Sequence, residues 1–242
     1  MKIGLQLWSV HEEMTNDFFG TLEKVAKMGY DGIEFAGYFG HDAGVIKEKL
    51  SVLGLQVAAT HIPIEALRDK FDEVIAFEKE LGNQYIVCPY ATFETVEAWI
   101  PFAKELNEIN QKIKKAGLTF IYHNHAEEFQ KLDVGYVLDL ILENVDKAEI
   151  DVYWAEFAGV NPIAYLAQYS GRTPLVHIKD MAETKDKSTE VGNGILDIKA
   201  IAKQAEKNGA EWLIVEQEAF TRPTLESVEI GLKNLKEILK DD

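Results

Sequence analysis

One pattern recurs along this chain and limits its fold more than any other feature: a helical stretch ends at a glycine, and a short apolar run follows. Glycine accepts the left-handed backbone conformation in which many helices end. The runs that follow are rich in β-branched and aromatic residues, which favour buried strands. The six glycines are Gly29, Gly54, Gly82, Gly117, Gly171 and Gly209. The pattern predicts six strands, at residues 32–35, 56–59, 85–88, 119–122, 175–178 and 212–215.

Two more strands complete the series. Ile3–Leu7 is an apolar run at the start of the chain, and Ala148–Val152 fills the interval between Gly117 and Gly171, which is twice the usual spacing. Eight strands in 242 residues give about 30 residues per unit, the size of one strand–helix unit. Four of the helices predicted between the strands carry apolar residues at helical spacing: Phe18–Met28, Thr92–Ala116 with a kink or break at Pro101, Leu196–Lys207 and Leu225–Leu239.

The alternation of strands and helices defines an α/β fold, for which two architectures compete. A doubly wound open sheet usually has a glycine-rich phosphate-binding turn after its first strand. Here the first strand is followed by Trp8-Ser9-Val10-His11 instead. Because there are eight units and no linker or low-complexity segment, residues 1–242 are predicted to form a single (β/α)8 TIM barrel domain.

Charge and composition exclude several classes of partner. The chain has 41 acidic and 25 basic residues, and its formal net charge of −16 disfavours both nucleic acid and an anionic membrane surface. No apolar run approaches the roughly 18 residues of a membrane span. The single cysteine, Cys88, forms no internal disulfide, so nothing points to secretion. We therefore expect a soluble cytoplasmic protein, and both a monomer and a homo-oligomer are compatible with the sequence.

Polar side chains gather where the predicted strands end. In a TIM barrel the active site lies at the carboxyl ends of the strands, and five of the six histidines fall at or just after such ends. Alternate residues of a strand face the same way. The pairs that share a face are His123 and His125, His177 and Lys179, and Glu216 and Glu218. The inward-facing ends of the last four barrel strands are thus expected to meet.

Four of these side chains form a candidate metal site: His123, Asp151, His177 and Glu216. Asp151 and Glu216 end apolar strands, where an unpaired buried carboxylate is costly, and a bound cation relieves that cost. Mixed imidazole and carboxylate ligands suit Mn²⁺, Zn²⁺ or Co²⁺, whereas Mg²⁺ prefers oxygen ligands alone. Two further candidates have equally plausible structural explanations, Glu34 as a loop cap and His61 as a hydrogen-bonded core histidine.

These residues carry a family resemblance that spans nearly the whole chain. The sequence resembles the xylose-isomerase-like TIM barrels, and within them the sugar phosphate isomerase/epimerase group. That family typically holds one divalent cation with Glu, Asp, His and Glu from strands five to eight, which implies Asp151, His177 and Glu216 for the last three ligands. The first position is His123 or, from the following loop, Glu128. The matching stretches are residues 4–10, 29–37, 59–63, 122–125, 176–180 and 215–218.

The resemblance also implies a function. We expect a divalent-metal-dependent isomerase or epimerase that acts on a ketose or related polyhydroxy carbonyl compound through an enediolate. In this scheme Glu216 is both ligand and base, and His123 or Lys179 transfers the second proton. The cation is Mn²⁺, Zn²⁺, Co²⁺ or Mg²⁺. Substrate contacts are predicted at Trp8, Glu34, His61, His125 and Trp154.

Two alternatives stay open because His123 replaces a glutamate. In the family's epimerases two glutamates resemble a two-base pair, and the loss of one puts that mechanism in doubt. The Tyr-His-Asn-His stretch at residues 122–125 resembles inosose dehydratase-like proteins, so the first alternative is a dehydratase or lyase acting on an inosose or 3-keto sugar. The second is a barrel that binds a sugar or metal without turnover. The chain has only Arg68, Arg172 and Arg222, which favours an unphosphorylated sugar or cyclitol as the partner.

Overall fold

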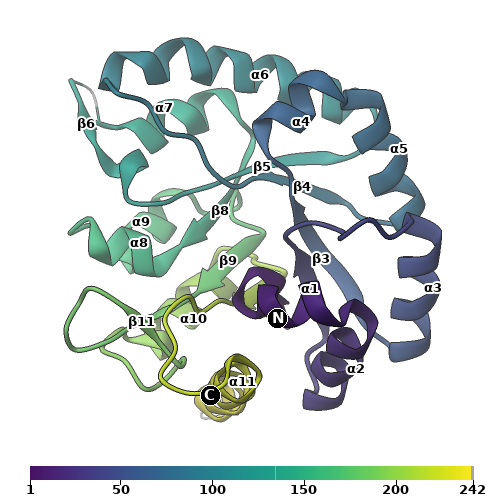
Figure 1. Cartoon of the computed structure of the whole chain (residues 1–242). Helices are drawn as coiled ribbons and strands as arrows, with labels where there is room; N and C mark the ends of the chain where they lie inside the picture. The colour runs from purple at the N-terminus through teal and green to yellow at the C-terminus, as the bar shows by residue number, and fades with distance from the viewer. Residues whose placement is uncertain (134, 241–242) are drawn as a thin grey trace.

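The chain folds as a closed parallel barrel, which confirms the predicted fold class. The computed structural model describes residues 1–133 and 135–240. The barrel strands follow one another in the order β1-β12-β9-β8-β5-β4-β3-β2, and Figure 1 shows the helices arranged around them. Their bounds are β1 Lys2–Gln6, β2 Gly32–Phe35, β3 Gln56–His61, β4 Tyr85–Cys88, β5 Thr119–His123, β8 Lys147–Asp151, β9 Leu175–Ile178 and β12 Trp212–Val215.

The helices follow the expected alternation, with one difference from the sequence prediction. The helix predicted over Thr92–Ala116 begins only at Trp99 and continues without a break past Pro101 to Lys115. Proline is tolerated in the first turn because the backbone N–H it lacks has no partner inside the helix there. The α-helices are α1 His11–Asn16, α2 Phe18–Met28, α3 Ala43–Leu53, α4 Ile64–Asp69, α5 Phe71–Leu81, α6 Trp99–Lys115, α7 Val137–Asn144, α8 Val152–Phe157, α9 Pro162–Gln168, α10 Ile198–Lys207 and α11 Thr224–Lys240.

Short elements decorate the loops between these units. Within the described residues, no helix is long and apolar enough to span a membrane. The 3₁₀ helices are η1 Leu7–Val10, η2 Val96–Ala98 and η3 Glu127–Phe129, and the two small hairpins are β6 Lys131–Leu132 with β7 Gly135–Tyr136, and β10 Asp180–Met181 with β11 Ser188–Thr189.

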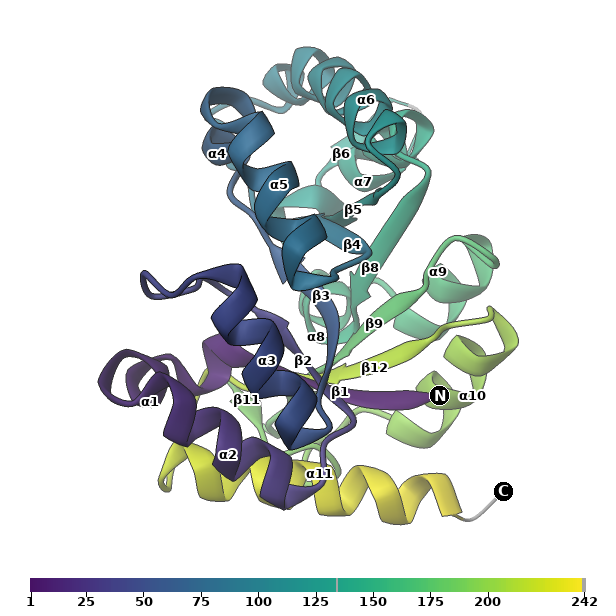
Figure 2. The ribbon, with the colours of Figure 1, turned by 90° about the vertical axis from the view of Figure 1, so that its right-hand side faces the viewer.

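Glycine ends several helices as the sequence pattern requires. Gly29 after α2 has a φ of 95°, and Gly82 after α5 has a φ of 87°, both in the left-handed region. The last helix, α11, closes the ring of helices: Lys236 donates a hydrogen bond of 2.7 Å to the carbonyl of Gly29, and Figure 2 shows α11 lying beside α2. In the same view β1 begins on the side where α11 ends, so the start of β1 and the end of α11 lie away from the carboxyl ends of the strands.

The side chains inside the barrel change from apolar to polar along the strands. At the end where the strands begin, it is filled by a separate apolar cluster of Ala58, Ala59, Val87, Ile121, Leu175, Trp212 and Ile214. Trp212 lies so close to β2 that a Cβ on Gly32 would come within 2.6 Å of its ring, so only glycine fits there. The carboxyl ends of the strands carry polar side chains instead, which is where a TIM barrel places its active site.

The hairpin after β9 fixes the loops around this polar end. The carboxylate of Asp180 accepts backbone hydrogen bonds from Met181, Gly192 and Gly194 at 2.8, 2.9 and 3.0 Å, which hold the loop that contains β11 against the end of β9. From that loop, the Ser188 hydroxyl accepts hydrogen bonds of 2.9 Å from the backbone of Glu218 and Ala219. The hairpin thereby fixes the chain just beyond Glu216.

Candidate metal centre and its cavity

Three acidic and imidazole groups converge where β8, β9 and β12 end. Asp151, His177 and Glu216 each place one ligand atom within 4.8 Å of the others. Asp151 and His177 are register neighbours on paired strands, and Glu216 follows β12 on the other side of β9. His177 Nδ1 lies 3.2 Å from Glu216 Oε2 and 3.8 Å from Asp151 Oδ2. We call these three residues the acidic cluster.

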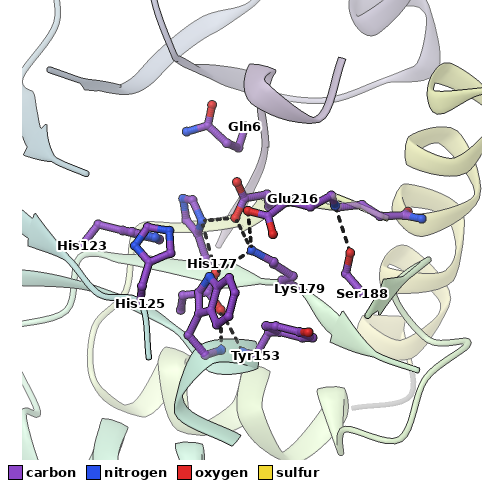
Figure 3. Close-up of polar contacts among 12 residues, drawn as sticks. Gln6, His123, His125, Tyr153, His177, Lys179, Ser188 and Glu216 are labelled. Carbon is purple, nitrogen blue, oxygen red and sulfur yellow. Dashed lines mark hydrogen bonds and ion pairs between the residues drawn. The ribbon is translucent and has the colours of Figure 1, made fainter. Parts of the chain in front are cut away.

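Lys179 brings a positive charge into the acidic cluster. Its Nζ lies 3.2 Å from Glu216 Oε2, 3.6 Å from Asp151 Oδ2 and 2.9 Å from Glu218 Oε1, although the side chain is completely buried. The ammonium also lies 4.7 Å from the centre of the Trp154 ring, a distance typical of cation–π contacts. Figure 3 shows Lys179 and Glu216 on one side of His177, with His123 and His125 on the other.

A second group of histidines and acids lies beside the first. His61, His123, Glu149 and His177 also offer ligand atoms within 4.8 Å of one another, and we call this set the histidine cluster. One oxygen of Glu149 is its hub: Oε2 lies 2.8 Å from His61 Nε2, 3.1 Å from His123 Nδ1 and 3.2 Å from His177 Nε2. All three distances are within hydrogen-bonding range. An ionised carboxylate can only accept hydrogen bonds, so the imidazole nitrogens are the donors.

Glu34 connects the two clusters through His177. Its Oε2 lies 2.6 Å from His177 Nε2 and accepts a hydrogen bond of 2.7 Å from the Gln6 amide, which extends from the end of β1. A carboxylate that binds one nitrogen of a metal-ligating histidine fixes the ring and its tautomer. With Nε2–H held by Glu34, the other nitrogen, Nδ1, is the one aimed at Asp151 and Glu216.

The charges of the histidine cluster balance one another. Although burial favours the neutral ring, the Glu34 and Glu149 carboxylates raise the pKa of His61 to about 10. Burial opposes charge on His177 as well, yet the same two carboxylates hold its pKa well above the ordinary value. Burial leaves the pKa of His123 well below its ordinary value, so this ring is neutral. Two anionic carboxylates thus face two cationic imidazoles in a buried layer.

The groups of the acidic cluster lie farther apart, with His177 Nδ1 3.2 Å from Glu216 and 3.8 Å from Asp151. Burial raises the pKa of Asp151 to about 7, despite the opposing Lys179 charge. Burial also disfavours ionised Glu216, but Lys179 and His177 hold its pKa well below the ordinary value. Asp151 Oδ1 accepts the backbone N–H groups of Tyr153 and Trp154 and caps α8, whereas its buried Oδ2 has no hydrogen-bond partner. That free oxygen, His177 Nδ1 and the Glu216 carboxylate form a donor set that fits a divalent cation such as Mn²⁺, Zn²⁺ or Co²⁺.

A cavity of about 730 Å³ leads to these clusters. His61, His123, His125, Glu216 and Glu218 line its polar end. Of the acidic cluster, Glu216 is 5% exposed, whereas Asp151 and His177 are 0% exposed behind it. A substrate that enters the cavity therefore meets the Glu216 carboxylate first.

The other residues predicted for the site lie at different depths. Trp8 is 52% exposed and lines the cavity at its rim, together with His61 and His125 from the predicted substrate contacts. Trp154 is half-buried and packs against Lys179, 5.3 Å from the His125 ring. Glu34 is fully buried and contacts His177 and Gln6, one layer below the cavity wall. The roles assigned to these residues stay predictions.

The structure also bears on the two candidates for the first ligand position. The Glu128 carboxylate accepts a hydrogen bond of 2.7 Å from the Tyr122 hydroxyl and one of 2.8 Å from the backbone of His125, outside both clusters. His123 instead lies beside His177, with 4.6 Å between the ring centres. His123 thus belongs to the histidine cluster and Glu128 to neither cluster, so the first ligand position stays a prediction.

Sequence reasoning missed the hub of the histidine cluster, Glu149. The signal was present: Glu149 lies two residues before Asp151 on β8, so both side chains point into the barrel. Apolar residues flank Glu149 on both sides and Asp151 stands at the end of the strand, so the local sequence marks Asp151 and not Glu149. The burial of Lys179 among three carboxylates was likewise not foreseen.

Known proteins resemble this chain over most of its length. An inosose dehydratase from Clostridium beijerinckii is 25% identical over an alignment of 251 positions that covers 84% of this chain and 83% of that protein. A solved sugar phosphate isomerase/epimerase from Parabacteroides distasonis superimposes with a TM-score of 0.83 at 25% identity, covering 99% of this chain and 98% of the other. The IOLI protein, solved with a zinc atom, shares the fold with a TM-score of 0.73 at 18% identity, covering 100% of this chain and 97% of the other.

Fold and site together define a TIM barrel with a buried carboxylate–imidazole centre at the carboxyl ends of its strands. The model of the xylose isomerase-like TIM barrel family matches residues 22–238. The chain belongs to that family.

Proposed function

We propose that this protein is an enzyme, a divalent-metal-dependent dehydratase that removes water from a cyclic polyhydroxylated ketone such as an inosose or a 3-keto sugar. The observation that carries the proposal is the pairing of Glu216 with Lys179, whose Oε2 and Nζ lie 3.2 Å apart. Glu216 is the base and Lys179 is the acid. Although burial disfavours the charged ammonium, the surrounding carboxylates hold the pKa of Lys179 above its ordinary value, so Lys179 carries a proton. Loss of water from a hydroxy ketone needs one of each.

The acidic cluster supplies the place for the cation. Asp151, His177 and Glu216 would hold it, and Glu34 would keep the His177 ring in position through its bond to Nε2. A divalent cation bound there would supply Lewis-acid stabilisation of the negative charge that develops on the carbonyl oxygen of the substrate. The unpartnered, buried Asp151 Oδ2 supports this assignment, because such an atom is costly unless a ligand satisfies it.

The protein's own residues then perform the proton transfers. Glu216 removes the proton from the carbon next to the ketone, and the C–H electron pair becomes the new carbon–carbon double bond. Lys179 donates a proton to the hydroxyl on the following carbon, whose C–O bond breaks to release water. Glu216 then returns its proton to Lys179 across the 3.2 Å that separates them, which restores both groups. His123, neutral and part of the cavity wall, can orient a substrate hydroxyl.

The similar proteins support this class of reaction. Inosose dehydratases are 22–26% identical to this chain over 81–85% of its length. These relatives are named as dehydratases of an inosose, and none of the described residues that line this cavity is an arginine. Both points favour a sugar or cyclitol without phosphate.

A second candidate is a sugar isomerase or epimerase, which is favoured by the Parabacteroides distasonis structure of that description. It needs the same removal of a proton by Glu216, followed by return of a proton to carbon. The difference lies in Lys179, which is required to release a hydroxyl but not to exchange a carbon-bound proton. That difference allows one experiment to separate the two reactions, and to separate both from a barrel that only binds.

The experiment follows deuterium and elimination together. The protein is stripped with a chelator, reloaded with Mn²⁺, Co²⁺, Zn²⁺ or Mg²⁺, and incubated in D₂O with an inosose, a 3-keto sugar or a ketose while NMR records exchange and enone formation. We expect elimination by the wild type, loss of both signals in Glu216→Gln, and exchange without elimination in Lys179→Met. Glu206→Gln, an exposed change on α10, is the control. Exchange into a ketose with epimer formation and no enone would identify the isomerase, and no exchange with any metal would identify a binding protein.

A further inference from the structure

The cavity has a second half that the proposed reaction does not use. It extends from the clusters along α4 and the first turns of α5, and we call this half the apolar arm. Its wall contains few polar groups, and the residues that form it are Ala36, Ile62, Pro63, Ala66, Val74 and Phe77. The arm and the polar end form one continuous space of about 730 Å³, within the range of pockets that bury drug-sized molecules.

The polar atoms at the far end of the arm already have partners. The Tyr38 hydroxyl donates to Glu78 Oε1 at 2.5 Å, and the Asn83 amide donates to Glu78 Oε2 at 2.8 Å. Both oxygens of this buried carboxylate are therefore satisfied within the protein. The wall offers an occupant apolar surface and little hydrogen bonding, which is unsuitable for the hydroxyl groups of a second sugar ring.

The wall of the arm includes an aromatic pair. The Tyr38 and Phe77 rings, which both line the cavity, lie with their centres 4.1 Å apart and their planes 32° from parallel, so this part of the wall is aromatic and well packed. Lys70 and Glu73 lie on the outer side of the arm, and both are exposed. The arm is thus apolar inside and charged at its outer edge, as in a pocket for a small molecule that is held inside and open to water at one end.

We propose that the true substrate carries an apolar, aryl-like substituent that occupies this arm while its polyhydroxylated ring lies at Glu216. This inference rests on the proposed function for the placement of the ring. The chemical class is an aryl glycoside or aryl-substituted cyclitol bearing a ketone, in place of a free sugar. Continuity of the arm with the polar end argues for one molecule that spans both halves.

Binding of two stable probes tests the inference. Phenyl β-D-glucopyranoside and methyl β-D-glucopyranoside carry the same ring and differ in the substituent, and isothermal titration calorimetry of the Mn²⁺-loaded full chain measures both. We expect the phenyl compound to bind at least about tenfold more tightly, because its ring leaves water for the apolar arm. Ala66→Trp, which fills the arm, should remove this preference and leave the methyl compound unchanged.

A matched control is available on the neighbouring helix. Ala76 on α5 is exposed and does not line the cavity, so Ala76→Trp should keep the phenyl preference. Equal affinities of the two probes for the wild type, no binding of the phenyl probe, or an unchanged preference in Ala66→Trp would each overturn the inference. So would a dimer in light scattering that Ala66→Trp dissociates, since a second copy would then cover the arm.

The test separates failure of this inference from failure of the proposed function. Elimination from unsubstituted inosose depends on Glu216 and Lys179 and needs no occupant of the arm, so the wild type alone reports on the proposed function. Elimination without a preference for the phenyl probe would contradict only the inference that the apolar arm holds an aryl substituent. A preference for the phenyl probe without any elimination would contradict only the proposed dehydratase activity.

Discussion

The acidic cluster and the histidine cluster share His177 but are bonded in different ways. In the histidine cluster, imidazoles lie 2.6 to 3.2 Å from Glu149 and from the adjoining Glu34, and ring charges balance carboxylate charges. In the acidic cluster the contacts are 3.2 to 3.8 Å, and the balancing charge comes from a lysine that also contacts Glu218. Glu34 and Glu149 each still have one buried oxygen without a hydrogen-bond partner, as Asp151 does.

The difference indicates separate tasks for the two clusters. A cation in the histidine cluster would have to displace protons from several rings that are already hydrogen-bonded. In the acidic cluster it displaces one proton from His177 Nδ1 and the ammonium of Lys179, whose side chain can withdraw toward Glu218. We infer that the histidine cluster supports the site and that the acidic cluster holds the ligand.

The largest expected effect comes from removing a ligand of the acidic cluster. Asp151→Asn keeps the shape and the α8 cap but removes the negative charge, so Mn²⁺ affinity should fall by more than about 100-fold, beyond the loss typical of outer partners. Unfolding free energy should change by less than about 1 kcal/mol. Isothermal titration and urea unfolding measure the two. Asp197→Asn, the same change at the cap of α10, is the control, and equal loss of affinity in both variants would contradict the account.

Breaking the hub of the histidine cluster should act mainly on stability. Glu149→Gln removes one of the two carboxylate charges that face the charged His61 and His177 rings, which should lower the unfolding free energy of the metal-free protein by about 3 kcal/mol at pH 7. Urea unfolding measures it. If Glu149→Gln instead left stability unchanged and abolished metal binding, the roles of the two clusters would be reversed.

Glu34 joins the clusters, so its substitution should give an intermediate effect. Glu34→Gln weakens the partner of His177 Nε2 and should reduce metal affinity by about 10- to 100-fold, as outer partners typically do. Metal titration of Glu34→Gln and Asp151→Asn side by side shows which substitution lowers the metal affinity more. A loss as large as that of Asp151→Asn would place Glu34 among the direct ligands.

Lys179 should oppose the metal that its neighbours attract. Lys179→Met removes an ammonium that lies 3.2 Å from Glu216, so Mn²⁺ affinity should rise by roughly tenfold while elimination is lost. Metal titration and the enone assay report these two effects. Reduced metal affinity in Lys179→Met would show that the lysine helps to build the site.

Glu128 lies outside both clusters and should show the smallest effect, visible as a pH dependence. Burial raises the pKa of Glu128 to about 7, above that of an unfolded glutamate, so the folded protein binds the extra proton. The contribution of Glu128 to the free energy of unfolding is therefore present below about pH 4.5 and is lost as pH rises through about 7. Glu128→Gln should be more stable than the wild type at pH 8, by about 1 kcal/mol, and no more stable at pH 5. Unchanged metal affinity is also expected, and a large loss would make Glu128 a ligand.

Much of this arrangement could be predicted from the sequence because it follows from periodicity. Glycines after helices located the strands, and the alternation of side chains along them placed His177 and Lys179, or Glu216 and Glu218, on one face. Bounds shifted by a residue where a strand meets a loop, as at Val152, which begins α8 instead of ending β8. Residues at strand ends were therefore assigned to the right end of the barrel.

What could not be predicted depends on contacts between distant segments. Glu149 receives bonds from β3, β5 and β9, and no local pattern reveals that three histidines meet on one oxygen. The apolar arm is built from loop and helix residues that are apolar for ordinary packing reasons, so Phe77 and Ala66 carry no local sign that they line a cavity. The position of the cation likewise depends on residues that are distant in the sequence and close together in the fold.

The central claim is that the cation belongs to the acidic cluster, and anomalous X-ray diffraction from crystals loaded with Mn²⁺ tests it most directly. The account expects a single peak in contact with Asp151, His177 Nδ1 and Glu216, with the Lys179 ammonium moved toward Glu218. A peak among His61, His123 and Glu149, or no peak in protein that titration shows to be loaded, would contradict it.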